Sequence, residues 1–248
     1  MRIALLSDIH GNLPALRAVL ARLEELGPFD TIVGLGDYVM GGIYAADVLA
    51  ELQQQGWPLV RGNTEEWVVQ AGTNGEEPAV NYPPEAEHRG ALGDLDQWTA
   101  DHIGPDGVAA LRGLPLRWDV TGPSGQVLAA VHSTPSSTHP VNRHTATDDT
   151  LSEVLEQAES DVLLYAHVHY AHIRDLPEGV VACIGSVGAP YDGDARACFM
   201  VAEDTGEGWS LQHERAAYDV EAYLTDLAAS DMPLREDFIR NIRNASAG

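Results

Sequence analysis

Lysine is absent from the sequence, and all 14 basic residues are arginines. A lysine-dependent phosphate loop and a lysine Schiff base are therefore excluded, so a side-chain cation that binds an anion must be Arg or protonated His. The 38 acidic residues give a formal net charge of −24 at pH 7. Such a charge repels nucleic acid and anionic membranes, although bound divalent cations can invert the potential locally. We therefore expect no duplex nucleic acid and no membrane as a partner, and a small phosphate ester stays open.

Cysteines and long apolar runs are also scarce. The two cysteines, Cys183 and Cys198, form no CxxC pair, which argues against a disulfide framework, and we expect both to be buried as small apolar side chains. The sequence has no run of about 18 apolar residues, so no transmembrane helix is expected. No small-residue cleavage site follows the short apolar start of the chain, and the cytoplasm is the expected location.

Apolar patterning predicts an α/β fold. The first part of the chain alternates strands with helices, which indicates parallel strands: strands at 2–7, 30–35 and 57–61, and helices at 13–26 and 44–55. Strands predominate later, at 115–120, 126–132, 161–166, 170–175, 179–184, 197–203 and 208–214, with one helix near 148–158. The sum predicts two packed sheets flanked by helices, a β-sandwich of the αββα type.

Two segments lie outside this pattern. Residues 70–113 are rich in Gly, Pro, Glu and Asp, and we expect loops and short helices inserted as a small cap. Residues 218–243 predict two helices that Pro233 separates. We therefore expect a single domain over 1–248, with a cap at about 70–113 and C-terminal helices at about 218–243.

Side chains that can bind metal ions follow several expected strands, at the point where each strand ends. Open α/β sheets place their sites at the carboxyl ends of strands. The candidates are Asp8 and His10 after the first strand, Asp37 after the second, Asn63 after the third, and His132, His167 and His169 at the ends of VLAAVH and VLLYAH. Each element alone is common by chance, and a single histidine here is more often structural or exposed, whereas the ordered set is specific.

The chemistry of this set favours two metal ions. Imidazole, carboxylate and amide ligands suit Mn, Fe or Zn and not a thiolate site. So many ligands are too many for one tetrahedral ion, whereas a bridging carboxylate would let them serve two ions about 3.5–4 Å apart.

The same residues resemble the calcineurin-like metallophosphoesterases. The family pattern is D-x-H, G-D, G-N-H-[DE], H and G-H-x-H, and here it reads Asp8-Ile-His10, Gly36-Asp37, Gly62-Asn63-Thr64-Glu65, His132 and Ala166-His167-Val168-His169. The resemblance covers roughly residues 1–63 and 126–200, and the segment 184–197 is similar to the bacterial phosphodiesterases and phosphatases of this family. The family fold, a β-sandwich between helices, agrees with the apolar patterning.

The resemblance implies a site with two divalent metal ions, with Mn²⁺ favoured and Fe, Zn, Ni or Co as alternatives. It assigns Asp8, His10, Asp37 and His169 to one ion, and Asp37, Asn63, His132 and His167 to the other, so that Asp37 bridges. It also implies that a hydroxide shared by the ions attacks phosphorus, which makes Asp37, Asn63 and His132 the candidate catalytic residues.

Thr64 departs from the family pattern, in which a histidine at this position stabilises the transition state or protonates the leaving group. Threonine is a poor general acid, and three interpretations stay open. The substrates could be esters whose leaving group needs little protonation, such as pyrophosphates, aryl esters or cyclic diesters. His139 or His144, in the loop after His132, could act instead, although a surface position is the alternative for both. The enzyme could also be weakened.

Three residues are candidates for substrate binding: Asn12, Arg61 and Arg143. The Asn12 amide could contact phosphate or could cap the helix that starts near Leu13. Either arginine could bind phosphate or pair with one of the many carboxylates.

The function favoured by these observations is binuclear metal-dependent hydrolysis of phosphate esters, with a phosphodiesterase on small nucleotide-type or other small diesters as the main hypothesis. One alternative is a phosphomonoesterase or protein phosphatase at the same site, which Thr64 disfavours because alkyl monoesters need help with the leaving group. Another is a catalytically weak binding or scaffold protein on this fold, which the intact ligand set disfavours. The C-terminal helices could in addition form a homodimer contact.

Overall fold

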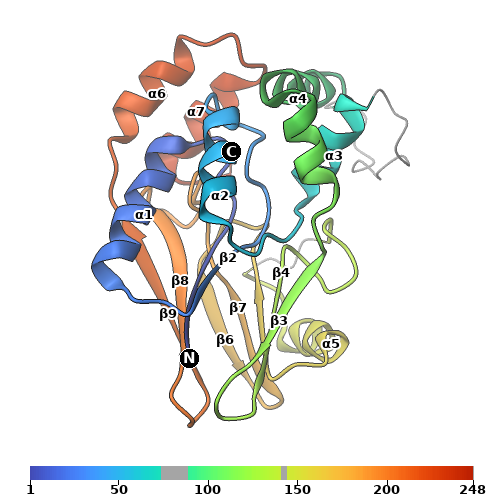
Figure 1. Cartoon of the computed structure of the whole chain (residues 1–248), viewed down its shortest axis with the longest axis vertical. Helices are drawn as coiled ribbons and strands as arrows, with labels where there is room; N and C mark the ends of the chain where they lie inside the picture. The colour runs from blue at the N-terminus through green and yellow to red at the C-terminus, as the bar shows by residue number, and fades with distance from the viewer. Residues whose placement is uncertain (74–88, 141–143, 248) are drawn as a thin grey trace.

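The computed structural model describes residues 1–73, 89–140 and 144–247 (Figure 1). The strands in these residues are β1 (Arg2–Leu6), β2 (Thr31–Gly34), β3 (Arg117–Thr121), β4 (Val127–Val131), β5 (Val162–Tyr165), β6 (His172–Leu176), β7 (Gly179–Cys183), β8 (Ala197–Asp204) and β9 (Trp209–Ala216). The helices are α1 (Leu13–Leu26), α2 (Ala45–Gln55), α3 (Asn63–Gly72), α4 (Arg89–Arg112), α5 (Asp148–Ala158), α6 (Val220–Ala228) and α7 (Arg235–Asn244).

The strands form two mixed sheets, one in the order β2-β1-β8-β9 and the other in the order β3-β4-β5-β7-β6. In the first sheet β1 and β2 are parallel, and in the second β4, β5 and β7 are parallel, whereas the remaining pairs are antiparallel. Two sheets flanked by helices confirm the predicted fold class.

An apolar layer fills the space between the two sheets. Its fully buried members include Ile3, Leu5, Val33 and Leu35 from the first sheet, and Leu128, Ala130, Leu164 and Ala182 from the second. Side chains alternate along a strand, so β5 buries Leu164 against the other sheet and Leu163 against α5. This burial on both faces explains why β5 reads as a continuous apolar run.

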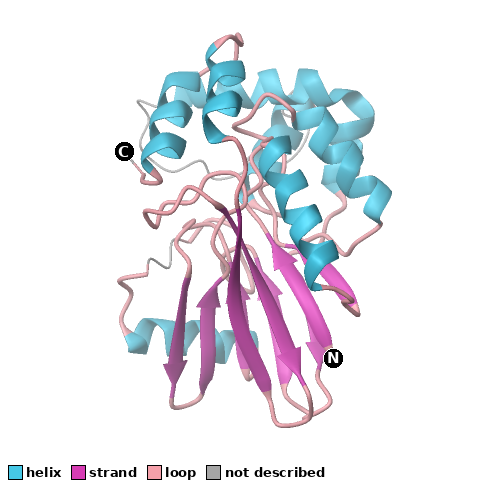
Figure 2. Cartoon of the chain, turned by 90° about the vertical axis from the view of Figure 1, so that its left-hand side faces the viewer, coloured by secondary structure: helices cyan, strands magenta, loops and turns pink. Residues whose placement is uncertain are grey.

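Helices cover the outer faces of the sandwich. Figure 2 shows most of them gathered together around one end of the strands, with one helix apart, which the labels of Figure 1 identify as α5. The first helix, α1, packs on β8 and β9. It begins where the Asn12 side chain accepts a hydrogen bond from the Ala15 N–H at 3.1 Å, and Pro14 occupies its first turn.

The expected third strand at 57–61 is wrong as a regular strand. A single bridge joins Leu59 to Gly34, with Gly34 N–H donating to the Pro58 carbonyl at 3.0 Å and Val60 N–H to the Gly34 carbonyl at 2.8 Å. Pro58 has no N–H to donate, and the chain enters α3 at Asn63, so the extended segment is too short for a ladder. Asn63 nevertheless follows an extended segment beside β2.

The segment 70–113 is more helical than expected in its described parts. Instead of loops and short helices it contains the end of α3 and the long α4, which breaks at Gly104, where φ is 69°, before Pro105. The helix α4 packs against α3 and α2. The high content of Gly and charged residues hid the apolar spacing, whose buried members are Leu95, Ala100, Val108 and Leu111. Residues 74–88 of the expected cap lie outside the described residues.

The C-terminal prediction is confirmed, because α6 and α7 are separate helices with Pro233 between them. Among the helices that the structure describes, none combines the length and the apolar character that crossing a bilayer requires.

Leu164→Ala should lower the free energy of unfolding by about 2–5 kcal/mol, because Leu164 is fully buried between the sheets and its truncation leaves a cavity. The control is Ile173→Ala on β6, where the side chain is 37% exposed. This change should cost less than about 1 kcal/mol. Urea denaturation of both variants measures the difference, and equal losses would show that the sheet interface does not dominate stability.

Candidate metal centre

The candidate ligands come together at one end of the sandwich, from loops that leave four strands. Asp8 and His10 follow β1, and Asp37 follows β2 in the same sheet. His132 follows β4 and His167 and His169 follow β5 in the other sheet. Because parallel strands of each sheet end on the same side, these loops meet over the apolar layer, and the site draws ligands from both sheets.

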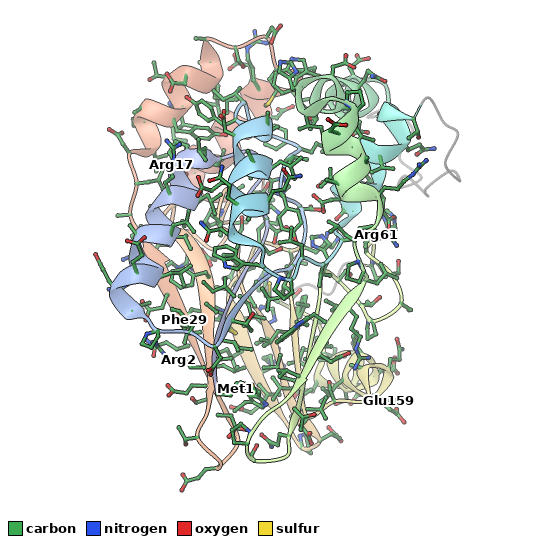
Figure 3. All side chains as sticks on the ribbon, in the orientation of Figure 1. Met1, Arg2, Arg17, Phe29, Arg61 and Glu159 are labelled. Carbon is green, nitrogen blue, oxygen red and sulfur yellow. The ribbon has the colours of Figure 1, made fainter. Side chains whose placement is uncertain are left out.

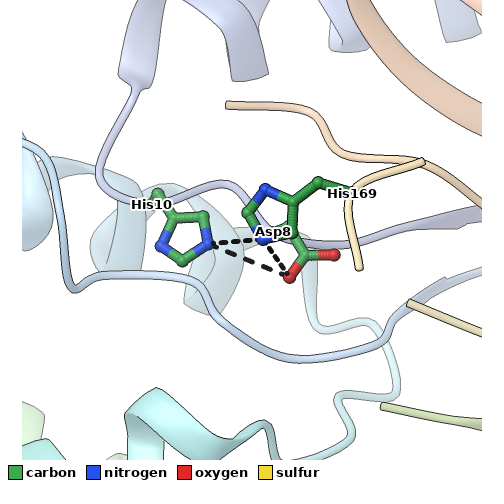
Figure 4. A group of neighbouring side chains, drawn as sticks. All are labelled: Asp8, His10 and His169. Carbon is green, nitrogen blue, oxygen red and sulfur yellow. Dashed lines mark hydrogen bonds and ion pairs between the residues drawn. The ribbon is translucent and has the colours of Figure 1, made fainter. Parts of the chain in front are cut away.

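One group consists of Asp8, His10 and His169 (Figure 4). The Nε2 atoms of His10 and His169 lie 3.2 Å apart. Asp8 Oδ1 lies 3.3 Å from His169 Nε2 and 3.9 Å from His10 Nε2. All three residues are buried.

A second group consists of Asp37, His132 and His167, with Asn63 beside it. His132 Nε2 lies 3.2 Å from His167 Nδ1, 2.8 Å from Asn63 Oδ1 and 3.5 Å from Asp37 Oδ1. The other Asp37 oxygen, Oδ2, lies 3.8 Å from His10 Nε2 in the first group. A single carboxylate therefore faces both groups.

Backbone carbonyls fix the orientation of three imidazole rings. The Nδ1 atoms of His10, His132 and His169 each lie 2.7 Å from a carbonyl oxygen, those of Met40, Leu35 and Ala189 respectively. A carbonyl only accepts, so each Nδ1 carries the proton and each Nε2 presents a bare lone pair to the centre.

These bare acceptors fit a cation. Asp8 Oδ1 is buried without a hydrogen bond from any described residue. The Asn63 oxygen faces the lone pair of His132 Nε2, and the lone pairs of His10 and His169 face each other. Acceptor atoms at such distances repel unless a positive charge lies between them. Carboxylate, imidazole and amide donors together suit a divalent transition metal ion.

The charges at the site agree with this interpretation. Burial lowers the pKa of His167, and the adjacent His132 lowers it further, to about 4, so this ring is neutral at pH 7. Burial raises the pKa of the Asp8 carboxyl, but His169, His132 and His10 lower it by more, and Asp8 is ionised. A neutral imidazole and an ionised carboxylate are the forms that bind metals.

The backbone at the site is strained. Asp8, His10, Asp37, His167 and His169 all have positive φ, between 49° and 68°. This left-handed region disfavours residues other than glycine, and such strain persists where the surrounding structure enforces it. Both candidate ligands of each D-x-H and H-x-H segment have this conformation, so the strain is concentrated at residues that form the two groups.

Glu65 supports the loop that carries Asp37. Its fully buried carboxylate accepts hydrogen bonds from the N–H groups of Asp37, Tyr38 and Gly62, each at 2.8 Å. Burial and the neighbouring Asp37 raise the pKa of Glu65 to about 7. The sequence signal for this support is the Glu that lies three residues after Gly62, in the first turn of α3.

Thr64 contacts the Asp37 carboxylate inside the site. Its hydroxyl and its N–H both donate to Asp37 Oδ1, at 2.9 and 3.0 Å. The hydroxyl proton is thereby engaged, and Thr64 orients the carboxylate that faces both groups.

The other candidates lie in different settings. Asn12 is fully buried and caps α1, which is the structural alternative given in the sequence analysis, and its amide donates to the Gly188 carbonyl and the Tyr218 hydroxyl. Arg61 and His139 both contact Glu66, outside the two groups. His144 stacks on Tyr170 at a centroid distance of 3.7 Å. Arg143 lies outside the described residues.

Sequence reasoning missed two contacts. Tyr191 stacks on His169 with ring centroids 4.5 Å apart, and Glu66 joins Arg61 to His139. Neither follows from spacing, because each joins segments far apart in the chain.

Comparison with known proteins agrees with this geometry. The sequence model of the calcineurin-like phosphoesterase family matches residues 1–171. The chain belongs to this family. No curated protein matches the sequence significantly.

Solved structures share the fold of this calcineurin-like phosphoesterase along its length. A metallophosphoesterase from Sphaerobacter thermophilus has a TM-score of 0.73 and 20% identity, with 99% of each chain covered. A hypothetical protein from Pyrococcus horikoshii has a TM-score of 0.79 and 20% identity, with 100% of this chain and 99% of that chain covered. At 20% identity, the similarity to these two structures shows a shared fold and no more.

Glu65→Gln should lower the free energy of unfolding by about 2–4 kcal/mol, because the amide group cannot accept all three backbone hydrogen bonds and places its own donors against N–H groups. Chemical denaturation measures this loss. The matched control is Glu153→Gln on the exposed face of α5, for which we expect a change within about 0.5 kcal/mol. Similar small effects at both positions would mean that Glu65 does not hold the Asp37 loop.

Proposed function

We propose that this phosphoesterase hydrolyses small phosphodiesters with two divalent metal ions, Mn²⁺ being favoured over Fe, Zn, Ni or Co. The observation that carries the proposal is the Asp37 carboxylate, whose Oδ2 faces His10 and whose Oδ1 faces His132. One carboxylate between two groups of bare acceptors is what a pair of ions sharing a ligand requires.

The ligand roles follow the two groups. Asp8, His10 and His169 would hold one ion, and Asn63, His132 and His167 the other, with Asp37 shared. Such ions, when bound, activate a water molecule for attack and neutralise the phosphoryl oxygens. The protein keeps the ligands oriented through the carbonyl contacts of Met40, Leu35 and Ala189.

A diester is favoured over other phosphate compounds for two reasons. The formal charge of −24 disfavours long nucleic acids and doubly charged monoesters more than singly charged diesters. Thr64 cannot protonate an alkyl leaving group, because its hydroxyl is bonded to Asp37. Nucleotide-type diesters and other small diesters with acidic leaving groups are the expected class.

The helices α3 and α4 pack together, and α3 begins at the ligand Asn63. We propose that the segment 70–113 acts as a cap that selects the substrate. The homodimer contact through α6 and α7 and the cytoplasmic location stay predictions.

Metal content should be two ions per chain in protein purified with Mn²⁺ and dialysed. Asp37→Ala should lower this to one ion or fewer, because the shared ligand is lost. Asp175→Ala, an exposed carboxylate on β6, is the control and should keep both ions. Elemental analysis by mass spectrometry measures the ratio, and a wild-type ratio of one would contradict the binuclear proposal.

Hydrolysis of bis-p-nitrophenyl phosphate in Mn²⁺ should exceed that of p-nitrophenyl phosphate, and Asp37→Ala should lower the diester rate by about 10²-fold or more. Asp175→Ala again serves as the control. Faster turnover of the monoester would favour the phosphatase alternative. A wild type that holds metal but hydrolyses neither ester would favour the binding or scaffold alternative.

A further inference from the structure

A second polar cluster lies outside the two ligand groups and consists of Arg61, Glu66 and His139. Glu66 Oε2 lies 3.1 Å from His139 Nε2, and Glu66 Oε1 lies 3.2 Å from Arg61 Nε. The side chains of Arg61 and His139 are 30% and 26% exposed, so the cluster reaches solvent. Figure 3 shows Arg61 on the side of the molecule where α3 and α4 lie.

The cluster is tied to the metal centre through both of its segments. Glu66 lies one helical turn after Asn63 on α3, which places the two side chains on the same helix face. His139 belongs to the loop that starts at His132, and a turn joining Thr134 and Ser137 folds this loop back. Asn63 and His132, whose side-chain atoms lie 2.8 Å apart, belong to the second ligand group, so both segments of the cluster start at ligands of that group.

The His139 ring is held in place. Carboxylates only accept hydrogen bonds, so Nε2–H of His139 donates to Glu66. The Trp67 ring lies beside the imidazole, with centroids 6.1 Å apart. Burial raises the pKa of Glu66, but His139 and Arg61 lower it by more, and the carboxylate stays charged. The contact with Glu66 is made by Nε2, and this leaves Nδ1 of His139 for another group.

Cleavage of an ester with an alkyl leaving group needs a proton donor, and most of the ring and hydroxyl protons at the ligand groups are already engaged. The rings of His10, His132 and His169 give their Nδ1 protons to carbonyls. Thr64 gives its hydroxyl proton to Asp37, and the Asn12 amide is bonded on both hydrogens. His139 lies on a segment that starts at the second group, and Glu66 fixes the orientation of its ring.

We propose that His139 protonates the leaving oxygen of the substrate, that Glu66 orients its ring, and that Arg61 holds Glu66. This inference rests on the proposed phosphodiesterase function and widens its substrates to diesters with poor leaving groups. The arrangement follows the logic of a carboxylate that fixes a histidine tautomer and stabilises the charged ring.

The step balances as follows. Water forms the new bond to phosphorus and loses one proton to solvent. The bond from phosphorus to the leaving oxygen breaks and its electron pair stays on that oxygen. The Nδ1 proton of the His139 imidazolium goes to this oxygen, which leaves the neutral ring with its proton on Nε2. A proton from solvent then returns to Nδ1.

The test uses phenyl phosphodiesters that share one ester group and differ in the acidity of the leaving phenol, from p-nitrophenol to phenol. His139→Ala should lower the turnover of the phenyl ester by about 10²-fold or more, and that of the p-nitrophenyl ester by less than about tenfold. His139→Gln, whose amide can still donate to Glu66 from the position of Nε2, should behave like His139→Ala. Glu66→Gln should give a ratio of the two turnover rates between those of the wild type and of His139→Ala.

His102→Ala is the matched control, because His102 is exposed and stacks on Trp98 in α4. This variant should keep the wild-type dependence of turnover on the acidity of the leaving phenol. Metal content and melting temperature are measured for every variant, so that a loss of ions or of folding is seen directly. Equal loss on both esters in His139→Gln would overturn the proposal and assign His139 a structural role. Hydrolysis of no ester by the wild type would refute the phosphodiesterase itself.

Discussion

The repulsion between buried acceptor atoms is the constraint on which the site depends. Lone pairs of three imidazoles, an amide oxygen and two carboxylates converge within a few ångströms, and the three rings cannot turn away because carbonyls hold their Nδ1 protons. Only a positive charge relieves this arrangement. Burial lowers the pKa of His132 and of His169, yet Asp37 and Asp8 raise them by more. In the metal-free state a proton is therefore drawn to the place that a metal would occupy.

The strained backbone is concentrated at the ligands. Left-handed φ occurs at Asp8 and His10 and at His167 and His169, the candidate ligands of the D-x-H and H-x-H segments. The cost is met by contacts that lock the loops, such as the three amides that bind Glu65. Stability and ligand geometry are thus coupled at this end of the sandwich.

Much of the fold and of the candidate site could be predicted from the sequence. Strand ends could be located from apolar runs, and parallel strands bring their carboxyl ends together, so the grouping of Asp8, Asp37, His132 and His167 was predictable. The two C-terminal helices followed from the position of Pro233. Other features depend on tertiary contact. Residues 57–61 form no regular hydrogen-bond ladder with β2, because Pro58 and the start of α3 at Asn63 leave the extended segment too short. Asn12 donates hydrogen bonds to Gly188 and Tyr218, and His139 donates one to Glu66. These contacts join positions far apart in the chain, which no local sequence pattern connects.

The division of ligands between the sheets also bears on how the molecule assembles. One sheet supplies Asp8, His10 and Asp37, and the other supplies His132, His167 and His169. Each half alone holds an incomplete set, and β1 acquires its partner β8 only after most of the chain has been made. An ion bound at this site would link the two sheets, and its ligand set would be complete only after both sheets have formed. Its binding would therefore follow the completion of the fold and oppose separation of the sheets.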